Sequence, residues 1–360
     1  MLEAAYKMLE EQIARVDFSV LWKGFRPLKF AIYDDERTFF DGRFVEKTNE
    51  FTANTTINYR GEDIAIWYLE GDSVRVDPES LASKIIHEMF HAFQQKNGES
   101  REAKELEALV RYRYHVENLG ARYKEATLLR SLLEIENDKD AAAQRECFLQ
   151  LLALRAERKE RFPYEYDYEA RTEQIEGSAT YVELRALEQL SPEKALKERM
   201  RLLAFIEDVS SCFPVRPLCY ASGAFLLELL HREQYRACIA SDFDPEAFTD
   251  RPFADDMLQG ITPSETLPEA DKTLVRQLEV FHSETEELIK KTLAKNDVLL
   301  EGDFFLISPN IYDARFRAPY ITSRYFVAYK DENDEVQVIR DPMLLIETDG
   351  NLRVRRIYRG

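Results

Sequence analysis

Residues 77–98 read DPESLASKIIHEMFHAFQQKNG and contain the strongest local signals in the chain. Asp77 is a good helix N-cap, and Pro78 suits the first helical turn because its N–H would have no helical partner there. The Asn-Gly pair that closes the stretch is typical of a helix end. These signals predict a helix over about 78–96, with the motif HEMFH in its middle.

The patterns on either side of this helix predict an α+β protein. Before it, two runs at 55–59 and 64–69 alternate in the manner of a β-hairpin around a polar turn. After it, helical periodicity dominates to about residue 295, and short strand-like runs separated by Asp, Asn and Gly turns follow. We expect a small N-terminal mixed sheet, a mainly helical zincin-like body and a small β-rich C-terminal module.

The same patterns divide the chain into two predicted units. Residues 1–295 form the main domain, and residues 296–360 form the β-rich C-terminal module. Within the main domain, two long charged amphipathic segments at about 100–162 are expected to form an inserted antiparallel helical hairpin. Their charges are expected on a solvated outer face rather than on a binding surface.

Composition narrows the classes of partner and compartment. The chain has 67 acidic and 49 basic residues, a formal net charge of −18, and this disfavours nucleic acid as a partner. No run of about 18 apolar residues is present, so we expect no membrane span, and the charged N-terminus is unlike a secretory signal. The few cysteines show no metal-binding spacing and are expected to be reduced thiols of a cytoplasmic protein: Cys147, Cys212, Cys219 and Cys238.

The motif HEMFH carries the chemistry. His87 and His91 are four residues apart, so a helix places both imidazoles on one side, within reach of a single ion. Imidazole nitrogen suits Zn²⁺, and Glu88 can take a proton from a coordinated water. In a chain with five histidines the pattern HExxH arises by chance on the order of one per cent of the time. We therefore expect about one zinc ion per chain.

A catalytic zinc site needs a third protein ligand besides the two histidines. The extended motif HExxHxxGxxH is absent, since Gln and Asn stand where its Gly and its third His would be. A carboxylate on a later helix is the natural candidate, and segment 172–181, TEQIEGSATY, offers one. Small residues at 177–179 would let this helix pack close to the HEMFH helix.

The combination of HEMFH with EGSATY at 176–181 resembles the gluzincin metallopeptidases, the thermolysin and aminopeptidase N group. In that group a Glu on a downstream helix, often in the form Glu-Gly-x-Ala, is the third zinc ligand. The resemblance implies that His87, His91 and Glu176 bind zinc and that Glu88 is the general base.

A second run supports the aminopeptidase N branch. YASGAFLL at 220–227 is similar to its Tyr-x-x-Gly-x-x-Leu-Leu run, whose Tyr stabilises the oxyanion. The resemblance makes Tyr220 the catalytic candidate, with an ordinary core tyrosine as the alternative. His231 lies about 16 Å further along a continuous helix and cannot reach the same oxyanion. We expect structural or surface roles for three histidines: His115, His231 and His282.

The resemblance to this group covers roughly residues 28–235. The chain also departs from the pattern of the group. Thr180 stands where the thermolysin pattern has an Asp that orients a zinc histidine. The Gly-x-Met-Glu-Asn stretch that anchors a free N-terminus in the aminopeptidases is missing, so exopeptidase action does not follow. Glu173 and Glu183 remain alternative third ligands.

The expected function is a zinc-dependent peptidase that acts on a peptide or protein substrate. One alternative is a non-enzymatic interaction protein with a structural or vestigial zinc site, and another is a zinc hydrolase of non-peptide bonds. The run at 64–69 is either an edge strand that pairs with the substrate backbone or an internal strand.

Overall fold

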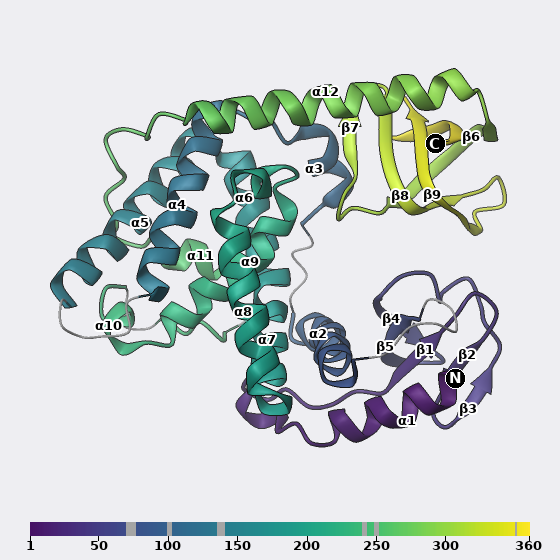
Figure 1. Cartoon of the computed structure of the whole chain (residues 1–360), viewed down its shortest axis with the longest axis horizontal. Helices are drawn as coiled ribbons and strands as arrows, with labels where there is room; N and C mark the ends of the chain where they lie inside the picture. Colours follow the sequence, from purple (N-terminus) through teal and green to yellow (C-terminus); the bar gives the residue numbers. More distant parts are fainter. Residues whose placement is uncertain (70–76, 99–102, 135–140, 240–242, 248–251, 350) are drawn as a thin grey trace.

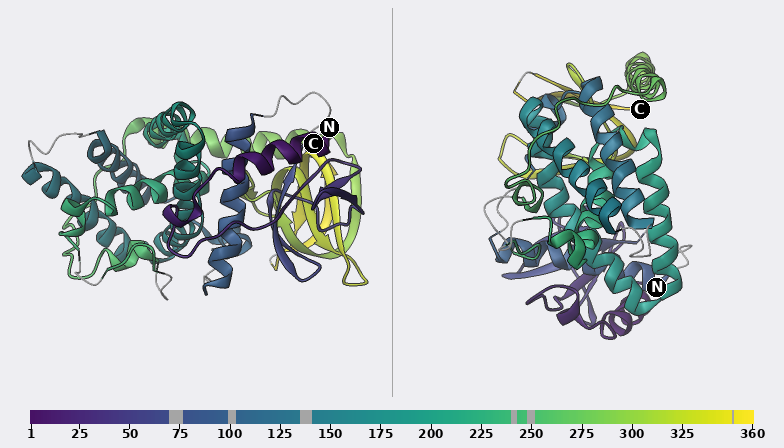
Figure 2. Two further views of the ribbon diagram at one scale, coloured as in Figure 1. Left: turned by 90° about the horizontal axis from the view of Figure 1, so that it is seen from below. Right: turned by 90° about the vertical axis from the view of Figure 1, so that its left-hand side faces the viewer.

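The computed structural model has an α+β fold, as expected. It describes residues 1–69, 77–98, 103–134, 141–239, 243–247, 252–349 and 351–360. Two five-stranded sheets lie at one end of the long axis, together with both chain termini, and the helical body fills the other end (Figures 1 and 2). None of the helices in the described ranges is long and apolar enough to cross a membrane.

The N-terminal unit is a mixed sheet packed against helix α1 (Leu2–Ile13). Its strand order is β3-β2-β1-β5-β4, and only the β1–β5 pair is parallel. The predicted hairpin is confirmed as β4 and β5, but β5 is internal and β4 is the edge strand. The strands are β1 (Phe30–Tyr33), β2 (Thr38–Phe40), β3 (Arg43–Val45), β4 (Thr55–Tyr59) and β5 (Glu62–Tyr68).

Helix α2 (Pro78–Lys96) has the predicted bounds. The Asp77 side chain accepts a hydrogen bond from the Ser80 N–H, as an N-cap does. One face of α2 is apolar and packs between β5, α1 and the later helix α7. The HEMFH motif is thereby fixed at the boundary between the N-terminal sheet and the helical body.

The helical body contains the predicted hairpin as α4 and α5, which contact each other. Helix α4 also packs on α8 and α9, so the hairpin is built into the core of the body. The elements are α3 (Glu105–Arg111), α4 (Val116–Glu134), α5 (Ala141–Arg161), α6 (Pro163–Thr172), a π-helix (Glu173–Gly177), α7 (Ser178–Leu190), α8 (Pro192–Glu207), α9 (Arg216–Leu230), α10 (Glu233–Arg236) and α11 (Phe253–Asp256). Two short 3₁₀ helices cover Phe18–Val20 and Val209–Cys212.

Not all charges of the hairpin lie on the solvated outer face. Three arginines and three glutamates from α4, α5, α6 and the π-helix form a buried charge cluster, each residue at most 2% exposed. Arg158 binds Glu169 with two N–O distances of 2.7 Å. The other members are Arg122, Arg155, Glu125 and Glu173. Charged side chains enter the core here because each finds an opposite charge.

Glu173 shows what the cluster does to a single carboxylate. Its oxygens accept hydrogen bonds from Arg122, Arg155 and the Ser222 hydroxyl. Burial opposes ionisation, but Arg155 and Arg122 outweigh it and lower the pKa of Glu173 to about 2. The π-helix is therefore anchored to α4, α5 and α9 by an ionised side chain.

The π-helix and α9 approach unusually closely at two glycines. A Cβ on Gly223 would lie 2.6 Å from the Glu173 carbonyl oxygen and 2.8 Å from the Gly177 Cα. A side chain at either position would push the two helices apart. The small residues at 177–179 predicted close packing on the HEMFH helix. Gly177 also allows close packing on α9.

The C-terminal module is an antiparallel sheet reached through the long helix α12 (Lys272–Lys295), which runs along one edge of the molecule (Figure 1). The strand order is β6-β10-β9-β8-β7, and β6 also pairs with β8, so that the sheet curls back on itself. The short strand-like runs at 336–340 and 344–347 form one continuous strand, β9. The strands are β6 (Val298–Pro309), β7 (Arg315–Arg317), β8 (Tyr320–Lys330), β9 (Val336–Thr348) and β10 (Arg353–Arg359).

Candidate metal centre

The structure brings together the three residues expected to bind zinc. The Glu176 Oε2 atom lies 3.5 Å from His87 Nε2 and 3.3 Å from His91 Nε2, and the three atoms all lie within 4.8 Å of one another. Tetrahedral zinc ligands at bond lengths of about 2.0–2.1 Å are about 3.3–3.4 Å apart. The donor types and the two separations between the carboxylate and the imidazoles therefore fit one zinc ion.

Both imidazoles are oriented by acceptors on their far side. His87 Nδ1 lies 3.0 Å from Glu183 Oε2, and His91 Nδ1 lies 2.8 Å from Gln94 Oε1. The Gln94 amide is itself fixed, because its Nε2 donates to the Ile175 carbonyl and the Ser178 hydroxyl at 2.9 Å. With Nδ1–H donating outward, each Nε2 lone pair is directed at the candidate metal position.

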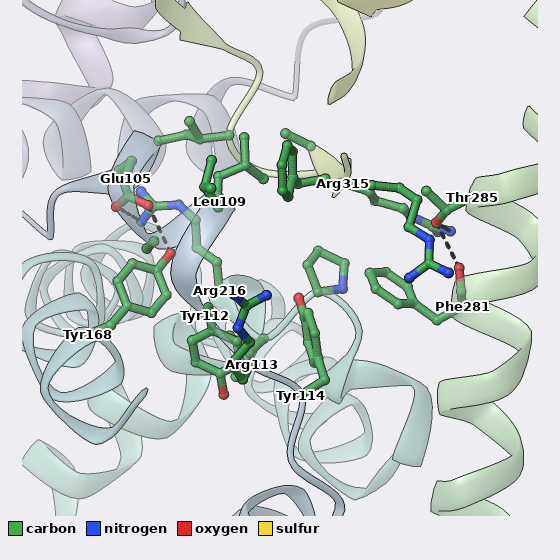
Figure 3. Close-up of a pocket in the computed structure, with 18 of the residues that line it drawn as sticks. Glu105, Leu109, Tyr112, Arg113, Tyr114, Tyr168, Arg216, Phe281, Thr285 and Arg315 are labelled. Carbon is green, nitrogen blue, oxygen red and sulfur yellow. Dashed lines mark hydrogen bonds and ion pairs between the residues drawn. The ribbon is translucent and has the colours of Figure 1, made fainter. Parts of the chain in front are cut away.

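Glu176 is held by its other oxygen. Arg216 Nη2 donates to Glu176 Oε1 at 2.7 Å, which leaves Oε2 for an ion. Arg216 also pairs with Glu105, and the Tyr168 hydroxyl donates to Glu105 at 2.8 Å. Figure 3 shows Arg216 and Tyr168 meeting at Glu105. The three residues line a pocket that is distinct from the cavity at the histidines. This chain of buried and half-buried groups restricts the carboxylate that would bind the metal.

The two alternative third ligands have other partners. Glu173 is enclosed in the buried charge cluster, away from the histidines. Glu183 approaches the outer nitrogen of His87, so it orients a ligand and does not occupy the ligand position. Glu183 thus orients a histidine, as the Asp of the thermolysin pattern does from the position that Thr180 takes in this chain. The Thr180 hydroxyl donates to the Glu176 carbonyl oxygen.

Three histidines take no part in the site. His231 hydrogen-bonds the Leu227 carbonyl and Glu246 and stacks on the Tyr181 ring. His115 and His282 are likewise absent from the residues that line the cavity at the site. The expectation of structural or surface roles agrees with these positions.

The charged neighbours of His87 and Glu176 determine the protonation states of these two side chains. Burial disfavours a charged imidazole, but hydrogen bonds to Glu176 and Glu183 outweigh it and raise the pKa of His87 to about 10. Burial also works against ionised Glu176, yet His91 and Arg216 outweigh it and lower the pKa of that carboxyl well below its usual value. The imidazoles therefore hold protons at the position that a metal ion would occupy, and a bound metal would displace these protons.

Glu88 lines the cavity beside the two histidines. Burial, partly offset by His91 and His87, raises the pKa of its carboxyl. Its backbone carbonyl accepts a hydrogen bond from the Thr56 hydroxyl of the edge strand β4. The strand and the motif are therefore connected directly.

Tyr220 lies on α9 at the same cavity. Its ring is nearly parallel to that of His87, with the centroids 6.3 Å apart. Burial, opposed by Arg216, raises its pKa well above the usual value, so the phenol keeps its proton and can donate it in a hydrogen bond. This position suits the expected contact with an oxyanion.

The cavity has a volume of about 820 Å³ and collects residues from all parts of the fold. Besides the metal-binding triad, Glu88 and Tyr220, its lining includes segment 52–55, Trp67 and Tyr68 of the N-terminal sheet and segment 308–312 of the C-terminal module. Pockets of about 300–1,000 Å³ are typical of ligand sites. The site is therefore open to a ligand of moderate size.

Sequence reasoning did not identify Gln94, Arg216 or Glu105. Gln94 was noted only as the replacement of a motif glycine, although its position three residues after His91 places it on the same helical face. Arg216 precedes the Tyr220 motif by four residues and so lies one turn away from it, which is a usable signal. No sequence signal connects Glu105 to the site, because its pairing with Arg216 depends on tertiary packing.

The chain was compared with protein-family models, with curated proteins and with solved structures, and none of the three comparisons found a match.

Proposed function

We propose that this protein is a zinc-dependent peptidase whose metal is held by His87, His91 and Glu176. The observation that carries the proposal is the convergence of two Nε2 atoms and one carboxylate oxygen within 4.8 Å of one another, at the wall of a cavity. The outward hydrogen bonds to Glu183 and Gln94 support it, because metal-binding histidines commonly have such partners.

A zinc ion at this position would polarise the substrate carbonyl and lower the pKa of a coordinated water towards 7. The residues of the chain would do the rest. Glu88 takes a proton from the attacking water as the new C–O bond forms, and Tyr220 donates a hydrogen bond to the oxygen that gains negative charge. Glu88 then returns the proton to the amine nitrogen as the C–N bond breaks. One water and one peptide bond give one carboxyl group and one amine.

The first test is the metal content of protein purified without chelators, or its uptake of zinc by titration. We expect about one zinc per chain, and Glu88→Gln should keep it. Wild-type protein should cleave members of a diverse peptide library, and Glu88→Gln should lose at least about 10²-fold in rate.

Glu79→Gln is the matched control, since Glu79 lies on the same helix but pairs with Lys194 and does not line the cavity. It should retain both zinc and activity. Absence of zinc binding, or full activity in Glu88→Gln, would contradict the proposal. Hydrolysis of esters or non-peptide amides without peptide cleavage would assign a different substrate class to the site.

A further inference from the structure

The C-terminal module forms one wall of the candidate active site. Its contribution to the cavity lining is segment 308–312 at the end of β6, Tyr325 and Phe326 on β8, and Arg340 on β9. These residues face a lining built by the N-terminal sheet and the helical body. The two sheets lie on the same side of the helical body, one above the other (Figure 1).

Within this wall, Tyr312 is the residue best suited to contact a substrate. Its ring packs edge-on against Tyr220, with the centroids 6.0 Å apart, yet the residue is 54% exposed. A half-exposed aromatic ring inside a cavity, next to the proposed oxyanion donor, has a free face to offer a ligand side chain.

The module is also joined to the N-terminal unit at the cavity. Arg340 Nη2 donates to the Thr52 carbonyl at 2.6 Å, and the guanidinium lies 5.9 Å from the centre of the Tyr68 ring. A second hydrogen bond, 3.4 Å long, connects the Asn49 side chain to the Val336 carbonyl. Since Thr52, Tyr68 and Arg340 all line the cavity, these contacts form a bridge across one of its sides.

We propose that the C-terminal module is part of the substrate site and that the site accepts a single extended polypeptide strand, either a short peptide or an unfolded segment. This inference rests on the proposed peptidase function. A chain that doubles back needs a second strand about 4.7–4.9 Å from the first, plus its side chains. A cavity of about 820 Å³ with a bridged side holds a few residues of one strand. Tyr312 then contacts a substrate side chain beside the cleaved bond.

The test compares a linear peptide that the protein cleaves with the same sequence closed head to tail. We expect the value of kcat/KM for the cyclic form to be on the order of 100-fold lower, because the ring cannot enter in a productive position. Equal cleavage of the two forms by wild type, lost from both in Glu88→Gln, would overturn this inference and leave the peptidase proposal intact. If no peptide of either form is cleaved, both proposals fail.

Variants test the two features of the wall separately. Tyr312→Ala should raise KM for the linear peptide about 2- to 10-fold with zinc content and kcat retained, and Tyr312→Phe should restore most of the affinity. Phe305→Ala is the matched control, since Phe305 is equally exposed at 55% on the same module but outside the cavity lining. An unchanged KM in Tyr312→Ala would remove Tyr312 from the substrate site.

Arg340→Ala tests whether the bridge excludes the cyclic peptide. Loss of the guanidinium removes the 2.6 Å hydrogen bond to the N-terminal unit and should narrow the ratio between linear and cyclic substrates. A ratio that stays at its wild-type value would show that the bridge does not exclude the ring.

Discussion

Replacement of Glu183 by Gln tests the metal centre without touching a proposed ligand. In the wild type, Glu183 Oε2 accepts a hydrogen bond from His87 Nδ1 at 3.0 Å, and its side chain is only 15% exposed. Gln keeps an oxygen of the same reach but removes the negative charge that strengthens the imidazole as a zinc ligand. We expect zinc to bind more weakly while the fold is retained.

The magnitude follows from the type of hydrogen bond that is lost. A hydrogen bond to a charged group contributes about 1.5–3 kcal/mol and a neutral one about 0.5–1.5 kcal/mol. The difference of about 1–1.5 kcal/mol corresponds to roughly tenfold in affinity. Glu183→Ala removes the acceptor as well and should approach the 100-fold end of the range known for such partners.

Competition with a chromophoric chelator gives the zinc dissociation constant of each variant. Glu188→Gln is the control, because Glu188 lies on the same helix α7 and is exposed. It should bind zinc as the wild type does. If Glu183→Gln and Glu183→Ala both bind zinc within about twofold of the wild type, then the supporting role of Glu183 for His87 as a metal ligand is refuted.

Three further predictions use other parts of the site. Tyr220→Phe should keep zinc but lower kcat by about 10²–10³-fold, as loss of an oxyanion donor does; steady-state kinetics with unchanged activity would exclude the role. Gly223→Ala should destabilise the fold by about 1–3 kcal/mol, seen in denaturant unfolding, because its Cβ would meet the Glu173 carbonyl at 2.6 Å. The Glu173 pKa of about 2 lies below the unfolded value, so its stabilisation is present above about pH 4.5 and disappears as the pH falls to about 2. Unfolding measured at pH 5 and pH 3 should therefore show a smaller acid loss in Glu173→Gln than in the wild type.

The parts of the fold that follow from local signals were predictable. The Asp77 cap and the Asn97 end gave α2 its observed bounds, and helical spacing alone placed His87 and His91 on one side. The hairpin of β4 and β5 followed from alternation around a polar turn. In each case the decisive interactions lie within a few residues along the chain.

The parts that failed depend on contacts distant in sequence. Segment 173–177 has the composition of an α-helix, and its wider π-helical turn forms against α9, where Gly223 allows close approach. The burial of Arg158 was not predictable because a charged residue on an amphipathic helix normally faces water, and only the packing of α5 on α4 and α6 supplies its partners. The edge position of β4 depended in the same way on the parallel β1–β5 pairing.

The buried charge cluster and the candidate metal centre meet at one short segment, and this gives the cluster a role beyond packing. Glu173 points into the arginines on one side of the π-helix, while Glu176, three residues later, points to the histidines on the other. In a regular α-helix residues three apart share a face, so the wider turn is what allows one segment to serve both partners. Buried ion pairs seldom add net stability over apolar packing, but they are sensitive to geometry. Two guanidinium groups and the Ser222 hydroxyl fix Glu173 and thereby restrict the direction of Glu176. The proposed third ligand, 85 residues after His91, acquires a defined position in this way.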